Sequence, residues 1–201
     1  ISLLVKKARR DRRLSLKRRI EKALRYIREM VTARYHLRNV DHIGEHARTL
    51  GRPRVVNEGR IEIGDHVLVR SVNVPAEICT GRNGVLRIGD GVRLNYGSSI
   101  YAEKEITIGH RVRIGPYSWV VDTDFHDPYD HGVFPEGEAV HIEDDVWIGA
   151  GSVVLDGTIL RRGWVIGAMS LVRGELPAYT IQAGNPLRLL AEMPLPIYLT
   201  T

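Results

Sequence analysis

The sequence predicts an all-β solenoid preceded by a helical arm. Three observations lead to this prediction. Aliphatic residues recur every six positions through long stretches of the chain, glycine often follows them, and a basic amphipathic segment precedes the repeat. A six-residue period fits neither the 3.6-residue period of a helix nor a sustained β alternation, but it fits short strands joined by tight turns.

Residues 1–38 are expected to form a basic amphipathic helical arm. Residues 1–40 hold 14 Lys and Arg against three acids, a net charge of +11, whereas the rest of the chain has a net charge of −6. Apolar residues with helical spacing form one stripe: Leu16, Ile20, Leu24, Ile27, Val31 and Tyr35. Three roles are open for this stripe: packing on the protein's own body or a neighbouring subunit, docking on an anionic membrane surface, or supporting nucleic-acid binding. Nucleic acid is not an expected partner, because the arm has few aromatic residues and no base-reading motif.

The repeat predicts the body of the protein, residues 39–176. Large aliphatic residues keep one register from Ile142 to Val172, and a smaller residue such as Ser118 or Ser152 follows four positions later. Each strand should send both residues inward, and three strands should make one coil of about 18 residues. The glycine after the aliphatic residue is expected to allow turn conformations that a β-carbon would resist.

Two features depart from the repeat. Trp164 stands where the register requires a small inward side chain, so either the coil is distorted or Trp164 faces outward. The repeat also stops after Val120, and residues 122–141 read as an inserted loop. Insertions in solenoids project from one face and often carry function. Residues 177–201 are left as a C-terminal tail.

Several segments resemble the hexapeptide-repeat acyltransferases, namely IGDGVRLNYGSSI, ITIGHRVRIGPYS and VHIEDDVWIGAGSVVLDGTI. The resemblance is to the maltose/galactoside acetyltransferase-like branch and to bacterial sugar O-acetyltransferases of surface-polysaccharide synthesis, and RPRVVNEGRIEIGD, DTDFHDP and QAGNPLR support it. It covers about residues 43–190. It implies a left-handed parallel β-helix, a homotrimer with active sites between subunits, and acetyl-CoA as the donor.

His126, in the inserted loop, is the expected catalytic base. An imidazole titrates near neutral pH, so it can take a proton from a hydroxyl group and release it later. In the resembled family a loop His followed within two positions by Pro has this role, and His126-Asp127-Pro128 fits. We expect Asp122 or Asp124 to hold the tautomer of the ring.

Further site residues follow from the resemblance. Asn95 matches a family Asn near the acceptor hydroxyl, although an Asn at a turn is equally natural. Trp147 is expected to point outward and, by the resemblance, to lie beside the catalytic His. The resemblance also places coenzyme A along backbone amides and cationic side chains at five positions: Gly149, Ala150, Ala168, Arg173 and Arg188.

The resemblance therefore implies an enzyme, an acyl-CoA-dependent O-acyltransferase that moves an acetyl group from acetyl-CoA directly to a sugar hydroxyl. The expected setting is bacterial cell-surface polysaccharide or glycolipid synthesis in the cytoplasm, and peripheral contact with the inner face of the cell membrane through residues 1–38 is open. No metal is expected. No phosphate-binding loop or dinucleotide fingerprint is present, so ATP and NAD are not implied.

Two rival functions stay open. The first is a metal-dependent hydratase of the hexapeptide-repeat carbonic anhydrase type, with His126, His131 and either His110 or His66 as ligands. The second is a non-catalytic scaffold that the basic arm tethers to a membrane or an acidic polymer.

Overall fold

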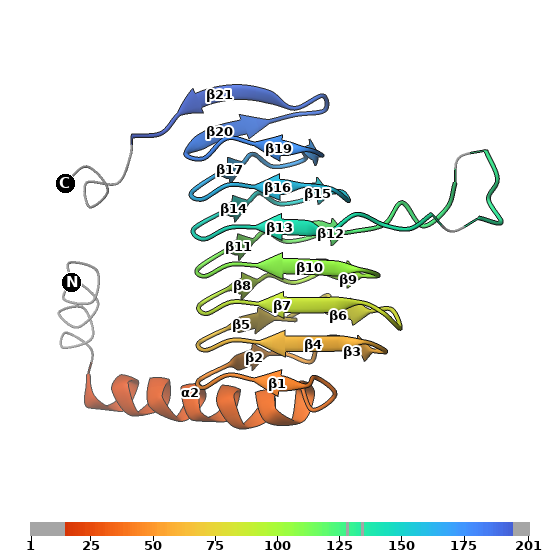
Figure 1. Ribbon diagram of the computed structural model, residues 1–201. Coiled ribbons are helices and arrows are strands. Elements are labelled where there is room, and N and C mark those ends of the chain that lie inside the picture. The colour runs from red at the N-terminus through yellow and green to blue at the C-terminus, as the bar shows by residue number, and fades with distance from the viewer. Residues whose placement is uncertain (1–14, 128, 134, 195–201) are drawn as a thin grey trace.

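The computed structural model describes residues 15–194, except 128 and 134. Its body is a three-sided stack of coils, with one helix across the N-terminal end and one loop that projects far from the side (Figure 1). This architecture confirms the predicted all-β solenoid with an N-terminal helix. The expected arm and tail both continue into residues 1–14 and 195–201, which lie outside the described residues.

Three sheets form the faces of the stack, and all their strands pair in parallel except the last strand of face 2. Face 1 contains β1 (His42–Ile43), β4 (Arg60–Ile63), β7 (Val85–Ile88), β10 (Glu105–Ile108), β13 (Val140–Ile142), β16 (Ile159–Leu160) and β19 (Glu175–Leu176). Face 2 contains β2 (Arg48–Leu50), β5 (Leu68–Arg70), β8 (Arg93–Leu94), β11 (Arg113–Ile114), β14 (Trp147–Ile148), β17 (Val165–Ile166), β20 (Thr180–Ala183) and β21 (Arg188–Glu192). Face 3 contains β3 (Arg54–Asn57), β6 (Glu77–Thr80), β9 (Ser99–Ala102), β12 (Trp119–Val121), β15 (Val153–Val154) and β18 (Leu171–Val172).

The coils stack in register. Ile108 of β10 pairs with Ile88 of the coil before it and with Ile142 of the coil after it. In Figure 1 the strands of face 1 lie in front and run to the left as the chain climbs, which makes the coil left-handed. The final strand, β21, turns back and pairs antiparallel with β20, so it closes the C-terminal end of the stack.

The interior follows the predicted pattern of one large and one small side chain per strand. The large aliphatic residues Ile114, Ile148 and Ile166 are buried, and so are the smaller Ser118 and Ser152. Uniform burial of both positions explains why a six-residue period appears in the sequence. The three residues between them face the turns and the solvent.

Trp164 points inward rather than outward. Its side chain is fully buried, and its indole N–H donates to the hydroxyl of Thr180 in the next coil. The strands around it still pair in parallel, with Trp147 opposite Val165 and Val165 opposite Ile181. The last coils therefore accommodate a large aromatic core residue without losing the ladder.

The glycines after the aliphatic residues are needed for a different reason from the one the sequence suggested. Gly115 and Gly149 do not have positive φ angles. A β-carbon on Gly115 would lie 2.6 Å from the backbone nitrogen of Ala150, and one on Gly149 would lie 2.5 Å from that of Ala168. The close approach of stacked coils therefore requires glycine there, whereas the left-handed conformation falls two residues later, as at Gly151.

The helix α2 (Leu16–His36) lies beneath the first coil (Figure 1). The Ser15 hydroxyl accepts from the backbone N–H of Arg18 and caps its N-terminus. Of the roles predicted for the apolar stripe, packing on the protein's own coils is wrong, because every member of the stripe is exposed. The helix instead meets β2 through the opposite side, where Glu29 and Ala33 are buried.

Candidate functional site

The three edges of the stack separate the predicted site residues. We define edge 1–2 as the turns from face 1 to face 2, edge 2–3 as the turns from face 2 to face 3, and edge 3–1 as the turns from face 3 back to face 1. The inserted loop leaves edge 3–1 between β12 and β13 and projects sideways (Figure 1). Each edge carries a different kind of chemistry.

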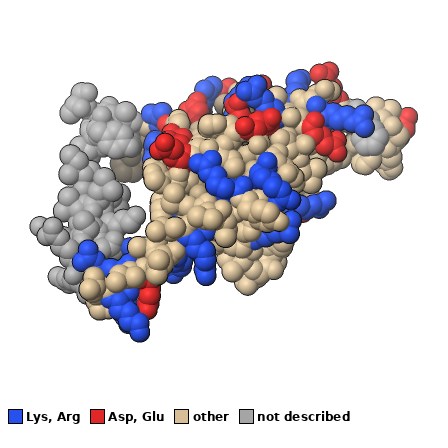
Figure 2. Space-filling model, turned by 90° about the horizontal axis from the view of Figure 1, so that it is seen from below, with Lys and Arg blue, Asp and Glu red and all other residues tan. Residues whose placement is uncertain are grey.

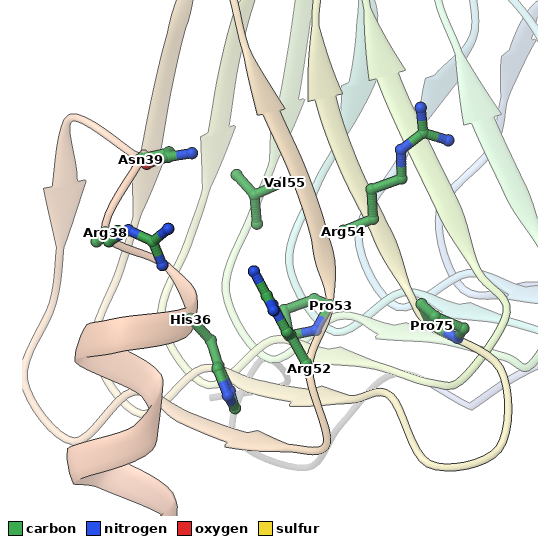
Figure 3. Close-up of a pocket in the computed structure, with 8 residues that line it drawn as sticks. All are labelled: His36, Arg38, Asn39, Arg52, Pro53, Arg54, Val55 and Pro75. Carbon is green, nitrogen blue, oxygen red and sulfur yellow. The ribbon is translucent and has the colours of Figure 1, made fainter.

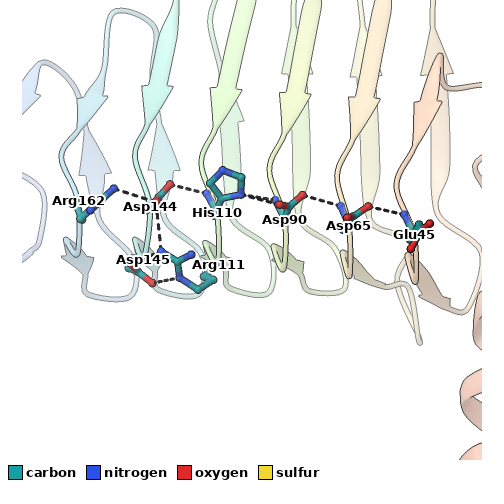
Figure 4. A network of polar contacts seen from close by, with 8 residues as sticks. All are labelled: Glu45, Asp65, Asp90, His110, Arg111, Asp144, Asp145 and Arg162. Carbon is teal, nitrogen blue, oxygen red and sulfur yellow. Dashed lines mark hydrogen bonds and ion pairs between the residues drawn. The ribbon is translucent and has the colours of Figure 1, made fainter. Parts of the chain in front are cut away.

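Edge 1–2 is a structural ladder. The side chain in each turn accepts the backbone N–H of the turn before it: Asp65 accepts from Glu45 (2.6 Å), Asp90 from Asp65 (2.8 Å), His110 Nδ1 from Asp90 (3.0 Å) and Asp144 from His110 (2.8 Å). Figure 4 shows this run, with Arg111 and Arg162 paired to the acids at its C-terminal end. These acids accept hydrogen bonds from turn N–H groups and pair with the two arginines, so they stabilise the stacking of the coils.

His126 lies on the projecting loop, and the fold of the loop tip fixes its ring. The His126 Nδ1 atom is 3.0 Å from the backbone oxygen of His131. A carbonyl oxygen can only accept, so Nδ1 carries the proton and Nε2 has the lone pair in the neutral ring. The tip is closed by a further bond from the Asp127 N–H to the Val133 oxygen (3.0 Å). The ring is exposed on the loop.

Neither acid expected to orient this ring has that contact. Asp124 pairs with Arg173 at 3.2 Å, and Arg173 also pairs with Asp156 at 2.7 Å. Asp122 is fully buried and accepts from the backbone N–H groups of Glu103 (2.7 Å) and Lys104 (2.9 Å). Burial raises the pKa of the Asp122 carboxyl, although these two hydrogen bonds oppose the rise. Both acids therefore anchor the base of the loop.

A hollow of about 490 Å³ lies at the base of this loop. Its walls include Tyr101, Phe125, Glu103 and Lys104. The Tyr101 and Phe125 rings lie 5.5 Å apart, and the Tyr101 hydroxyl donates to Glu103 at 2.5 Å, which raises the pKa of Tyr101 to about 12. Aromatic faces next to charged hydrogen-bonding groups suit a polyhydroxylated ligand. Sequence reasoning missed this hollow, because Tyr101 belongs to a coil 24 residues before Phe125.

Edge 2–3 brings together most of the residues expected to face coenzyme A. Gly149 and Ala150 occupy one turn, and Ala168 occupies the next turn, stacked directly on it through a bond from the Met169 N–H to the Ala150 oxygen (2.9 Å). Arg188 begins β21 opposite Ala183, at the same edge one coil further on. Ala150 and Ala168 are exposed residues, and within the described part of the chain their backbone N–H groups donate to no backbone acceptor.

Asn95 lies lower on the same edge. Its side-chain amide donates to the backbone oxygen of Ile114 (3.1 Å), so it bridges two successive turns. Its backbone oxygen also accepts from Ser98. Asn95 is thus engaged in stacking the coils at edge 2–3. Arg173, expected with the donor group, instead lies at edge 3–1 with Asp124 and Asp156.

Trp147 points outward from β14 as expected, and 53% of its surface is exposed. It lies on face 2 and lines a groove of about 610 Å³ together with Arg93, Arg113 and Tyr179. On a single chain this places Trp147 on a different side of the stack from the loop that carries His126.

The histidines named for a metal site are not gathered. His110 belongs to the ladder of edge 1–2, and the His66 ring stacks on His46 at 4.9 Å on the same edge, whereas His126 and His131 are on the loop of edge 3–1. Among residues 15–194, leaving aside 128 and 134, no group of three or more His, Cys, Asp and Glu side chains could hold a metal ion.

Comparisons with known proteins agree with this fold. The chain is 30% identical to a probable acetyltransferase, Rv3034c, of Mycobacterium tuberculosis, over 69% of this chain and 52% of that protein, so it spans about half of that relative's length. It is 28% identical to the putative lipopolysaccharide biosynthesis O-acetyl transferase WbbJ of Escherichia coli, over 83% of this chain and 86% of that protein. No protein-family model matches the chain.

A solved structure has the same fold. The hexapeptide-repeat containing acetyltransferase VCA0836 of Vibrio cholerae, complexed with acetyl coenzyme A, superposes with a TM-score of 0.59 and 23% identity, covering 82% of this chain and 78% of that one. In the part of this chain that the structure describes, no helix has the length and apolar character needed to cross a bilayer.

Proposed function

Because the chain belongs to the hexapeptide-repeat acyltransferases, we propose that it transfers an acetyl group from acetyl-CoA to a sugar hydroxyl, with His126 as the general base. The observation that carries this proposal is the fixed ring of His126. Its Nδ1–H is held by the His131 carbonyl, so Nε2 carries the lone pair that can accept a proton. A base held in one tautomer on a projecting loop suits proton removal from a bound acceptor.

The reaction needs one proton carrier and one site for developing negative charge. Nε2 of His126 takes the hydroxyl proton as the acceptor oxygen attacks the thioester carbonyl, and the same proton then passes to the departing sulfur of coenzyme A. A backbone N–H on edge 2–3, such as that of the exposed residue Ala150, stabilises the tetrahedral oxyanion. The only cysteine, Cys79, is half-buried on β6, and burial raises the pKa of its thiol, which disfavours an acyl-enzyme through this residue.

The proposed donor lies along edge 2–3. The N–H groups of the exposed residues Ala150 and Ala168 are spaced by one coil, which suits an amide-bearing pantetheine arm. Arg188, one coil further along, suits a phosphate of the nucleotide end, because a guanidinium offers paired donors to phosphate oxygens. Gly149 permits the close stacking that keeps this edge narrow.

The complete site forms between two copies of the chain in this proposal. His126 leaves edge 3–1, whereas Ala150 and Ala168 lie on edge 2–3 of the same stack. The loop projects away from its own coils (Figure 1), so a neighbouring stack is needed to bring a donor edge to its tip. This separation supports the homotrimer that the sequence resemblance implies. The outward Trp147 of face 2 is then available to a neighbouring loop.

The proposed acceptor is a sugar of a cell-surface polysaccharide or glycolipid. The hollow at the loop base, with the Tyr101 and Phe125 rings beside Glu103 and Lys104, supports a sugar acceptor near the loop that carries His126. The similarity to WbbJ, a putative lipopolysaccharide biosynthesis O-acetyl transferase, supports the setting. We place the reaction on the cytoplasmic side, where coenzyme A thioesters are made.

The test measures acetyl transfer from acetyl-CoA to a panel of sugars, and release of the free thiol of coenzyme A is the readout. His126→Ala should lower kcat by about 10²–10⁴-fold, the usual contribution of a positioned general base. His42→Ala is the matched control, because His42 is an exposed ring at the N-terminal end of face 1. Transfer at the wild-type rate by His126→Ala would exclude the mechanism. Transfer only to amino sugars would mean that the acceptor group is an amine and not a hydroxyl.

A further inference from the structure

The helix α2 is fixed to the coils by its polar side. Glu29 is buried and pairs with Arg48 of β2 at 3.0 Å and with Arg25 at 3.6 Å. Ala33 and Leu37 are buried beside it, and the Arg48 guanidinium lies 4.5 Å above the centre of the Tyr26 ring. If the helix turned, the buried Glu29 carboxylate would lose the Arg48 guanidinium, and an unpaired buried charge is costly, so this contact favours one orientation of the helix.

The opposite side of the helix presents a continuous apolar stripe. Its six members are between 51% and 70% exposed: Leu16, Ile20, Leu24, Ile27, Val31 and Tyr35. At 100° per residue this stripe lies nearly opposite Glu29 and Ala33, so it faces away from the stack. A surface helix ordinarily turns its apolar face to the protein core, and this helix does the reverse. An exposed row of this length indicates a binding surface.

The charges around the stripe show what kind of surface it fits. The helix holds seven Lys and Arg against two acids, one of which is the buried Glu29. Lys17 and Arg28 border the stripe on one side, and Arg34 borders it on the other. Figure 2, seen from this end of the molecule, shows basic side chains along the helix, whereas most acidic side chains lie in the upper part of the view, interspersed with basic ones. A second copy of the helix would bring like charges together.

A basic hollow of about 360 Å³ adjoins the C-terminal end of the stripe. His36, Arg38 and Arg52 face it, and Arg54 points away from it (Figure 3). Among the described residues, none of those that line the hollow is acidic. The Arg38 guanidinium lies 4.6 Å from the centre of the Tyr35 ring, so the hollow and the stripe share a border. Burial, followed by the charges of Arg52 and Arg38, lowers the pKa of His36, which agrees with a positive potential in the hollow.

We propose that α2 is a docking helix for an anionic lipid bilayer. The apolar stripe lies at the boundary between headgroups and acyl chains, the flanking Lys and Arg meet the headgroups, and Arg38 and Arg52 hold a lipid phosphate in the hollow. The stripe faces along the axis of the stack, so the coils stand upright on the membrane. Because strands stack about 4.8 Å apart, the loop after β12 stands about 20 Å above the helix, clear of the headgroups.

The experiment measures binding of the full chain to sedimented vesicles of neutral phosphatidylcholine with and without 30% phosphatidylglycerol (roughly the anionic share that gives a strong surface potential). Anionic vesicles should bind at least about tenfold more tightly than neutral ones, and high salt should remove most of that difference. Equal partitioning onto the two kinds of vesicle would overturn the proposal.

Variants separate the apolar and the basic contributions. Leu24→Gln with Ile27→Gln keeps charge and helix propensity, and it should weaken binding to anionic vesicles by about tenfold or more. Leu190→Gln, an exposed leucine of β21 at the other end of the stack, is the matched control and should leave binding unchanged. Unchanged binding by the Leu24 and Ile27 variant would refute insertion of the stripe.

Charge variants test the headgroup contacts. Arg28→Gln and Arg34→Gln should each weaken binding about fivefold at low salt, as should Arg38→Gln, because each cation near an anionic surface contributes a similar amount. Arg82→Gln, an exposed arginine in the turn after β6, should have no effect. Equal losses for Arg82→Gln would mean that only net charge matters and would refute a defined docking face.

Two further readouts follow the fold and the oligomeric state of the variants. Circular dichroism should show that the variants keep the wild-type fold. Light scattering without lipid should give the same mass for the wild type and for the Leu24 and Ile27 variant. A lower mass for the variant would mean that a second copy covers the stripe, and it would overturn the proposal. Acetyl transfer to a soluble sugar should be equal in all variants, so failure of docking is distinguishable from failure of the proposed reaction.

Discussion

The separation of His126 from edge 2–3 predicts that two inactive chains can restore each other. His126→Ala removes the base from the loop on edge 3–1. Ala168→Trp fills the exposed donor path on edge 2–3 without changing a buried position. Each variant alone should lose acetyl transfer, the first by about 10²–10⁴-fold.

The expected recovery follows from the symmetry of the proposed trimer. If each site takes its loop from one chain and its donor edge from the next, a mixed trimer always contains one site in which both parts are intact. This holds whether the trimer has two copies of the loop variant or two copies of the edge variant. Mixed trimers should therefore show about one third of the wild-type kcat.

The assay uses co-expression of the two variants with different affinity tags, followed by purification over both tags in sequence. Each single variant, purified in the same way from two tagged copies, is the control and should remain inactive. Mixed oligomers that stay at the level of the single variants would refute a site shared between chains. Recovery after mixing variants that cannot exchange subunits would also contradict the reasoning.

Three further predictions concern stability. Trp164→Ala should lower the free energy of unfolding by about 3–5 kcal/mol, as measured by denaturant titration, because it empties a fully buried site and leaves the Thr180 hydroxyl without its indole donor. Asp122→Ala should cost about 1–3 kcal/mol, since it leaves two backbone N–H groups at the loop base unpaired, and an unchanged thermal midpoint would contradict this. The pKa of Asp41 is lowered from its ordinary 3.8, chiefly by the hydrogen bond from the backbone N–H of Ile61. The ionised Asp41 therefore stabilises the fold above pH 3.8, and this stabilisation is lost as the pH falls through the lowered pKa. The difference in thermal midpoint between wild type and Asp41→Asn should therefore be larger at neutral pH than in acid.

The sequence was informative wherever the cause of a feature is local. The inward positions, the outward Trp147 and the inserted loop could all be predicted, because each coil repeats the same strand and turn and exposes or buries a residue by its place in the six-residue period. The glycines were found by the same pattern, but their reason was wrong. Gly115 is required by the backbone of the next coil, and sequence spacing contains no measure of that distance.

What only the tertiary structure decided is which residues share an edge and which side of the helix meets the coils. Asp124 pairs with Arg173, 49 residues away, because the inserted loop starts and ends at edge 3–1. Insertions of different lengths enter between the strands, so separation along the chain does not reveal spatial neighbours. For α2 the apolar stripe predicted a helix but not the side that faces the stack, because the pair between buried Glu29 and Arg48 and the small Ala33 turn the other side toward the stack. A local pattern fixes which residues share a face, and only the partner across the interface determines where that face points.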